Sequence, residues 1–126
     1  MSKQVLKIIS DDMASLGLEY DFGTYKKSPV VYPYLVGEYQ ETEPMTEDGL
    51  QESTFLLTGF NRGAWLALEE VIEKIEKYYG YSGKTVITDN GSGVAIFYAG
   101  TLIVPTGDAE LTKIQVNLRI KEWKVN

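Results

Sequence analysis

The sequence predicts a single α+β domain spanning residues 1–126, in which an antiparallel β-sheet carries two main α-helices packed on one face. Three observations lead to this prediction. Two segments have the 3.6-residue apolar repeat of amphipathic helices, several others have the alternation or the β-branched content of strands, and their order is helix, strands, helix, strands. A chain of 126 residues is long enough for one domain with a proper core and too short for two ordinary domains.

The first helix is expected over residues 2–16. Ser2 can act as its N-cap, and Gly17 follows at a position where a left-handed residue commonly ends a helix. Apolar residues recur at intervals of four along one side of this helix, namely Val5, Ile9 and Met13. After the helix, residues 18–25 are expected to form a short extended piece.

Two strands are expected next, over residues 31–39 and 52–60, because both segments are rich in β-branched and aromatic side chains. Pro33 lacks a backbone donor, which favours a sheet edge or a bulge for the beginning of the first strand. The connection between the strands is long for a hairpin and rich in acidic residues. It is therefore predicted to be a mobile acidic hairpin loop at about residues 40–51.

The second helix has the clearest pattern. Asn61 is expected to be its N-cap and Gly80 to end it. Its apolar stripe consists of Leu68, Val71, Ile72, Ile75 and Tyr79. Two pairs on its outer side place glutamate four residues before lysine, the favourable order, namely Glu70 with Lys74 and Glu73 with Lys77.

The last part of the chain is expected to be all strand. Residues 85–88 and 94–98 flank Asn90-Gly91, and this dipeptide between two β-rich segments is a strong signal for a hairpin. In the final strand, four apolar residues alternate with four polar ones, which predicts an antiparallel sheet with one buried and one wet face. The alternating sets are Ile114, Val116, Leu118 and Ile120, and Gln115, Asn117, Arg119 and Lys121.

The composition excludes several classes of function. The chain has no cysteine and no histidine, which removes disulfides, thiolate nucleophiles, zinc sites built on these residues and histidine proton shuttles. We therefore expect no cofactor, no metal and no enzymatic activity. A net charge of −6 disfavours nucleic-acid binding, and no stretch approaches the apolar length of a membrane span. Asp11 and Asp12 interrupt the only apolar segment near the start, so no signal peptide is expected.

Adjacent carboxylates at Asp11-Asp12 and Glu69-Glu70 are expected on helices, with side chains about 100° apart. Such pairs cannot share one substrate atom, so each is interpreted as part of a solvated helix face.

The acidic segment around the predicted loop is the most unusual feature of the sequence. Six carboxylates fall within residues 38–52, which contain no lysine or arginine. Their spacing does not match an EF-hand, and the open interpretations are a solvated hairpin tip, a docking surface, or a metal site. The candidate interface residues are these carboxylates and the adjacent tyrosine: Glu38, Tyr39, Glu41, Glu43, Glu47, Asp48 and Glu52.

The order of these segments is similar to that of a known family. A leading helix is followed by Val31-Tyr32-Pro33-Tyr34-Leu35-Val36-Gly37, an acidic loop, and Phe55-Leu56-Leu57-Thr58-Gly59-Phe60 opening into an amphipathic helix. The chain closes on Ile114-Gln115-Val116-Asn117-Leu118-Arg119-Ile120-Lys121-Glu122-Trp123. Over most of its length the chain resembles the tail terminator (tail completion, or tail-to-head joining) proteins of long-tailed phages and prophages.

The resemblance implies an α+β structural protein that assembles into a hexameric ring. The ring would cap the head-proximal end of the tail tube, stop its polymerisation and join it to the head. The implied partners are further copies of the chain, the tail-tube protein and the head-tail connector protein, with neither nucleic acid nor membrane. The implied location is the virion tail, and the host cytoplasm during assembly. The long hairpin at residues 38–52 would make contacts within the ring or with the tube.

Two other classes of function remain open. A small acidic inhibitor or immunity-type protein could bind a basic partner through the glutamate-rich loop, as a monomer in a salt-sensitive complex. Reversing the charges at Glu43, Glu47 and Asp48 would weaken that complex. An enzyme using tyrosine or carboxylate chemistry has no sequence feature in its favour beyond the presence of those residue types.

Overall fold

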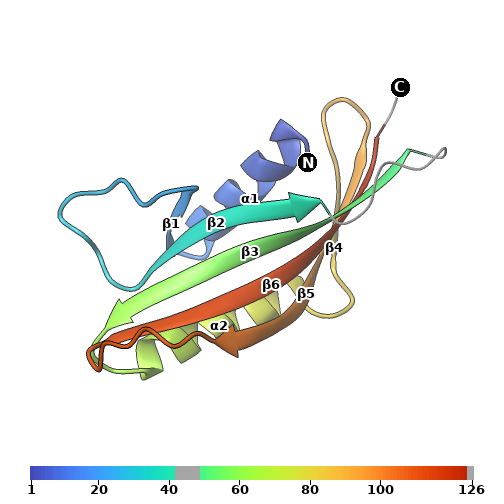
Figure 1. The fold of residues 1–126 in the computed structure, drawn as a ribbon. Coiled ribbons are helices and arrows are strands. Elements are labelled where there is room, and N and C mark those ends of the chain that lie inside the picture. The colour runs from blue at the N-terminus through green and yellow to red at the C-terminus, as the bar shows by residue number, and fades with distance from the viewer. Residues whose placement is uncertain (42–48, 125–126) are drawn as a thin grey trace.

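The computed structural model describes residues 1–41 and 49–124 and has two helices and six strands in those ranges (Figure 1). The N-terminus, the end of the last strand at residue 123 and the turn at residues 88–92 lie at the same end of the molecule. The elements in chain order are α1 (Lys3–Ser15), β1 (Glu19–Phe22), β2 (Tyr34–Glu41), β3 (Leu50–Arg62), α2 (Leu66–Tyr79), β4 (Lys84–Ile87), β5 (Gly93–Ile103) and β6 (Leu111–Trp123).

The strands form one six-stranded sheet in the order β1-β2-β3-β6-β5-β4. The general prediction of an α+β fold is confirmed. The prediction of a wholly antiparallel sheet is wrong, because β1 pairs parallel to β2 while the other neighbours are antiparallel. The chain returns through residues 23–33 before it enters β2, so both strands start from the same end of the sheet.

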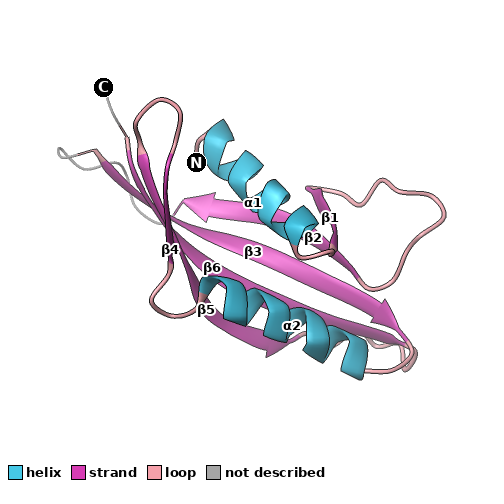
Figure 2. Cartoon of the chain, turned by 180° about the vertical axis from the view of Figure 1, so that it is seen from behind, coloured by secondary structure: helices cyan, strands magenta, loops and turns pink. Residues whose placement is uncertain are grey.

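One side of the central strands forms the core. Alternate residues of β3 and β6 are buried, as the period of two in a strand requires. They join the apolar sides of both helices in one cluster, and Figure 2 shows both helices in front of the sheet. The largest fully buried side chains include Phe55, Ile9, Met13, Leu57, Leu68 and Ile75.

The first helix forms as its sequence predicts. The backbone N–H of Val5 donates to the Ser2 hydroxyl, which is the N-cap, at 3.4 Å. Gly17 follows the helix with a φ of 72°, the left-handed conformation that glycine adopts without strain.

The second helix begins later than predicted. Asn61 is not its N-cap but a buried residue of β3, paired with Thr112 of β6. The Asn61 side-chain amide donates instead to the carbonyl of Ala64 at 2.8 Å. The helix begins at Leu66, because pairing between β3 and β6 continues as far as Arg62. Its end at Gly80 is confirmed.

The strands around the acidic segment also differ from the prediction. β2 begins at Tyr34, so Pro33 precedes it, and β2 lies between two strands and not at an edge. β2 and β3 continue in register to the pair Glu41 with Ser53, so residues 40 and 41 of the loop predicted at residues 40–51 are strand. Residues 50 and 51, at the other end of that loop, belong to β3 and pair with β6. The predicted hairpin around Asn90-Gly91 is confirmed as β4 and β5.

Candidate interaction surface

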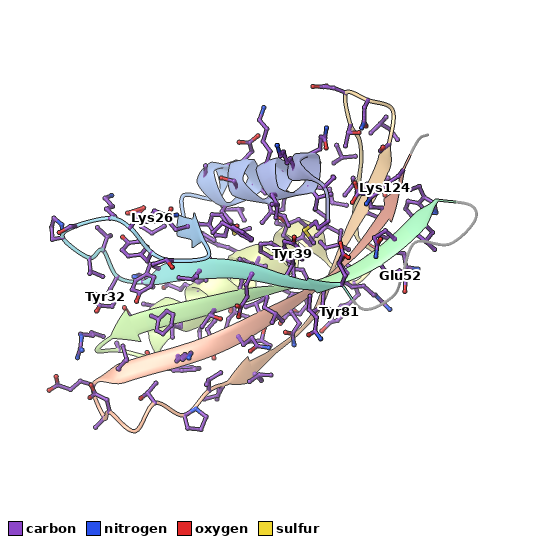
Figure 3. The ribbon with its side chains drawn as sticks, turned by 45° about the horizontal axis from the view of Figure 1, so that its top comes forward. Lys26, Tyr32, Tyr39, Glu52, Tyr81 and Lys124 are labelled. Carbon is purple, nitrogen blue, oxygen red and sulfur yellow. The ribbon has the colours of Figure 1, made fainter. Side chains whose placement is uncertain are left out.

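The predicted acidic interface is divided between the two faces of the sheet. Tyr39 pairs with Phe55 and Glu41 with Ser53, so both side chains lie on the side of β2 that faces the helices. Glu38 of β2 and Glu52 of β3 occupy the alternate positions of their strands, so their side chains lie on the side of the sheet away from the helices. Figure 3 shows Tyr39 and Glu52 on their two strands. The other predicted residues, Glu43, Glu47 and Asp48, lie outside the described residues.

Two of the described carboxylates in this segment already have partners within the chain. Glu41 accepts a hydrogen bond from the ammonium group of Met1, and this bond and charge lower the pKa of the Glu41 carboxyl. Glu52 lies 3.6 Å from the ammonium group of Lys121. The described part of the segment is therefore not a patch of unpaired negative charge.

The side of the sheet away from the core cluster carries a continuous set of partly exposed side chains, which we call the open face. It consists of Tyr34, Val36 and Glu38 of β2, Glu52, Thr54, Leu56, Thr58 and Phe60 of β3, Phe97 of β5, and Lys113, Gln115, Asn117, Arg119, Lys121 and Trp123 of β6.

Aromatic rings gather at the end of the open face near the β1–β2 connection. The ring centroid of Tyr34 lies 4.1 Å from that of Tyr25, 5.6 Å from that of Tyr32 and 5.0 Å from that of Phe60. Figure 3 shows Tyr32 at this end and Glu52 near the other. Tyr25, Tyr34, Phe60 and Lys113 also line a hollow of about 430 Å³. The cluster offers apolar area of the kind that protein interfaces use.

Cations also lie over aromatic rings on the open face. The ammonium of Lys113 lies 5.2 Å from the centroid of Phe60, and the guanidinium of Arg119 lies 5.7 Å from that of Phe97. Arg119, Asn117 and Tyr81 help to line a second hollow, of about 590 Å³. The Tyr81 side chain is 71% exposed. The combination of arginine with exposed aromatic rings is typical of binding surfaces.

A buried polar network lies on the opposite side of the sheet and corrects one prediction. Asp11 is exposed as expected, but Asp12 is only 5% exposed and does not belong to a solvated face. The Asp12 carboxylate accepts hydrogen bonds from the hydroxyls of Tyr78 and Tyr79, each at 2.8 Å, and from the ammonium of Lys84 at 2.9 Å. The network joins α1, α2 and β4, so its role is to hold the helices on the sheet.

Two tyrosines, the buried Tyr79 and the partly buried Tyr20, should make the folded chain less stable at high pH. Burial raises the pKa of Tyr20 from 10.0 to about 12, and burial together with Asp12 raises the pKa of Tyr79 further. These phenols ionise near pH 10 in the unfolded chain but stay neutral in the folded one. Their stabilisation is therefore complete below pH 10 and is lost as the pH rises through the folded pKa values. We expect the free energy of unfolding to fall above pH 10 by about 1.4 kcal/mol per pH unit for each group.

Urea unfolding between pH 8 and pH 11.5 would measure this slope. Tyr20→Phe and Tyr79→Phe should each reduce it, whereas the same change at the exposed Tyr81 should leave it unaltered. An equal slope in the unmodified chain and in all three variants would show that the ionisation of Tyr20 and Tyr79 is not its cause.

Among residues 1–41 and 49–124, no three acidic side chains gather in a way that could hold a metal ion. No helix in the same part of the chain is long and apolar enough to cross a membrane. A comparison with protein-family models and with curated proteins finds no match to this sequence.

Proposed function

We propose that this chain is a tail terminator protein of a long-tailed phage or prophage. In this proposal it forms a hexameric ring at the head-proximal end of the tail tube, stops polymerisation and joins the tail to the head. The sheet carries both helices on one face, and its other face is covered on assembly. The partners are further copies of the chain, the tail-tube protein and the head-tail connector protein, in the host cytoplasm during assembly and then in the virion tail.

The open face is the observation that carries the proposal. It presents aromatic rings and cations on rigid strands, and these are the residue types enriched where proteins bind one another. A ring of identical subunits needs extended surfaces of this kind, because each subunit contacts two neighbours and, in a terminator, the tube as well. The resemblance of the element order to that of tail terminator proteins indicates which kind of ring this would be, a hexamer at the end of a tail tube.

The alternative, an acidic inhibitor that binds through the glutamate-rich segment, is less well supported. Glu41 and Glu52 are neutralised by Met1 and Lys121, so a basic partner would have to displace contacts that the chain already makes. Among the carboxylates that the structure describes in this segment, only Glu38 has no cation within 4.0 Å.

The proposal expects a tail-tube protein to be encoded near this chain, and the experiment uses that protein, polymerised in vitro. Because the chain has no cysteine, Asp89→Cys in the exposed β4–β5 turn gives a single site for a fluorescent label. We expect the label at one end of each tube and an arrest of tube growth when the chain is added. An unrelated acidic protein of similar size is the control. Growth that continues, with the label absent from tube ends or spread along the tubes, would refute the proposal.

A further inference from the structure

Two cations on the open face have no counter-ion in the part of the chain that is described. Neither Lys113 nor Arg119 has a carboxylate within 4.0 Å among residues 1–41 and 49–124, and each lies over an aromatic ring. By contrast, Lys121 on the same strand is neutralised by Glu52. The open face thus carries two unpaired cations over aromatic rings, Lys113 at the end that holds Tyr34 and Arg119 six residues further along β6, together with the carboxylate of Glu38 near Lys113.

The outer side of α2 has the opposite character. The sequence predicts ion pairs between Glu70 and Lys74 and between Glu73 and Lys77, but neither pair comes within 4.0 Å in the structure. Glu70 and Glu73 are exposed, and Glu76 is partly exposed beside them. Glutamates outnumber lysines on the outer side of α2, so this surface is negatively charged. Its glutamates do not form the two predicted ion pairs with lysines of the same helix.

We propose that the outer side of α2 of one copy of the chain docks on the open face of a second copy. This inference rests on the proposed function and names the contact between neighbouring subunits. Each copy offers one negative and one positive surface, so the contact is heterologous and repeats head to tail, as a closed ring requires. The helix adds a third layer to the sheet, which is a stable way to cover an exposed sheet face.

The α2 helix is long enough to cover both cations of the open face. Its 14 residues span about 21 Å, and Lys113 and Arg119 lie about 20 Å apart along β6. Glu70 and Glu76 lie only about 9 Å apart along the helix axis, so the helix glutamates can oppose one of the two cations but not both at once. Leu66, at the start of α2, is 66% exposed and would bring an apolar side chain to the aromatic rings. A second copy is a better occupant than a nucleic acid, because the net charge of −6 repels a polyanion while α2 supplies negative charge locally.

The test is a charge swap between the two surfaces. The sheet variant carries Lys113→Glu and Arg119→Glu, and the helix variant carries Glu70→Lys and Glu73→Lys. Each variant alone places like charges on both of its surfaces, so we expect self-association at least about tenfold weaker than that of the unmodified chain. In an equal mixture, the negative sheet of one variant meets the positive helix of the other, and assembly should return.

Native mass spectrometry and sedimentation over a range of protein and salt concentrations would give the assembled fraction. Circular dichroism would verify that every variant is folded. The matched control is Lys3→Glu with Lys7→Glu, which makes the same change in charge on exposed residues of α1, outside both surfaces. This control should assemble like the unmodified chain.

Several results would overturn the inference. These are a monomer at every concentration, a sheet variant that assembles normally, and a mixture that stays dissociated. So would an unmodified chain that remains monomeric and instead binds an oligonucleotide through Lys113 and Arg119.

The tube-end assay separates these failures from failure of the proposed function. If the variants still label tube ends and arrest growth, the terminator function stands and only the contact is wrong. If the unmodified chain never labels tube ends, the function is wrong whatever the charge swap shows.

Discussion

Replacing Asp12 with alanine is expected to lower the free energy of unfolding by about 3 kcal/mol. The change removes the shared acceptor of the Tyr78 and Tyr79 hydroxyls and the Lys84 ammonium. The buried Tyr79 hydroxyl would then have no acceptor, and unsatisfied buried polar groups are costly. Because the Lys84 side chain is about one-third exposed, it can turn toward water, which places the cost at the lower end of the range for a broken buried ion pair. Urea unfolding at pH 7 would measure the change.

The adjacent Asp11 provides a matched control. It is an exposed residue of the same helix turn, so Asp11→Ala removes the same chemical group and should change stability by no more than about 0.5 kcal/mol. Asp12→Asn keeps an acceptor oxygen and loses the charge, so it should lie between the two alanine variants. If Asp12→Ala and Asp11→Ala cost the same, the network is not what holds α1 and α2 to β4.

The parts of the fold that could be predicted from the sequence are those governed by local chemistry. The N-cap at Ser2 and the glycine after the first helix lie where the structure has them. The alternation from Ile114 to Lys121 correctly assigns one face of β6 to the core, because a strand has no freedom to place neighbouring side chains on the same side. The hairpin at Asn90-Gly91 was equally predictable, because Gly91 adopts a φ of 86°, the left-handed conformation that glycine takes without strain.

The parts that could not be predicted depend on pairing between distant segments. Asn61 has good N-cap chemistry, but the strand pair that it makes with Thr112 prevails over that local preference. The parallel pairing of β1 with β2 likewise has no local signal. The burial of Asp12 did have one, because Asp12 lies seven residues after Val5 and therefore on the apolar stripe of α1. The neighbouring Asp11 made the pair look like an ordinary polar face.

The candidate interface was predicted from the charge of a sequence segment, without regard to which face of the sheet each of its residues would occupy. The period of two separates Glu38 from Tyr39 and from Glu41, so a run of acidic residues in the sequence becomes two surfaces in the sheet. The open face could not be found in the same way. Its contact between Lys113 and Phe60 exists only because β3 and β6 are neighbours with these two residues in register.

Replacing Phe55 with alanine is expected to cost about 3–5 kcal/mol of stability, and the same change at Phe60 about 1 kcal/mol. Both residues lie on β3, but Phe55 is 0% exposed in the core, whereas Phe60 is partly exposed on the open face. Removal of the Phe55 ring leaves a cavity beneath the helices. Removal of the Phe60 ring loses only its stacking on Tyr34 and its contact with Lys113. Urea unfolding of the dilute monomer would give both values.

The comparison also tests whether the open face is a surface for assembly. At concentrations where the chain associates, Phe60→Ala should weaken the assembly although it barely changes the monomer, because its ring is covered only when a partner binds. Phe55→Ala should weaken assembly only to the extent that it unfolds the chain. A cost at Phe60 equal to that at Phe55 in the monomer would mean that the ring is already covered there. The open face could then not be the surface that a neighbouring subunit occupies.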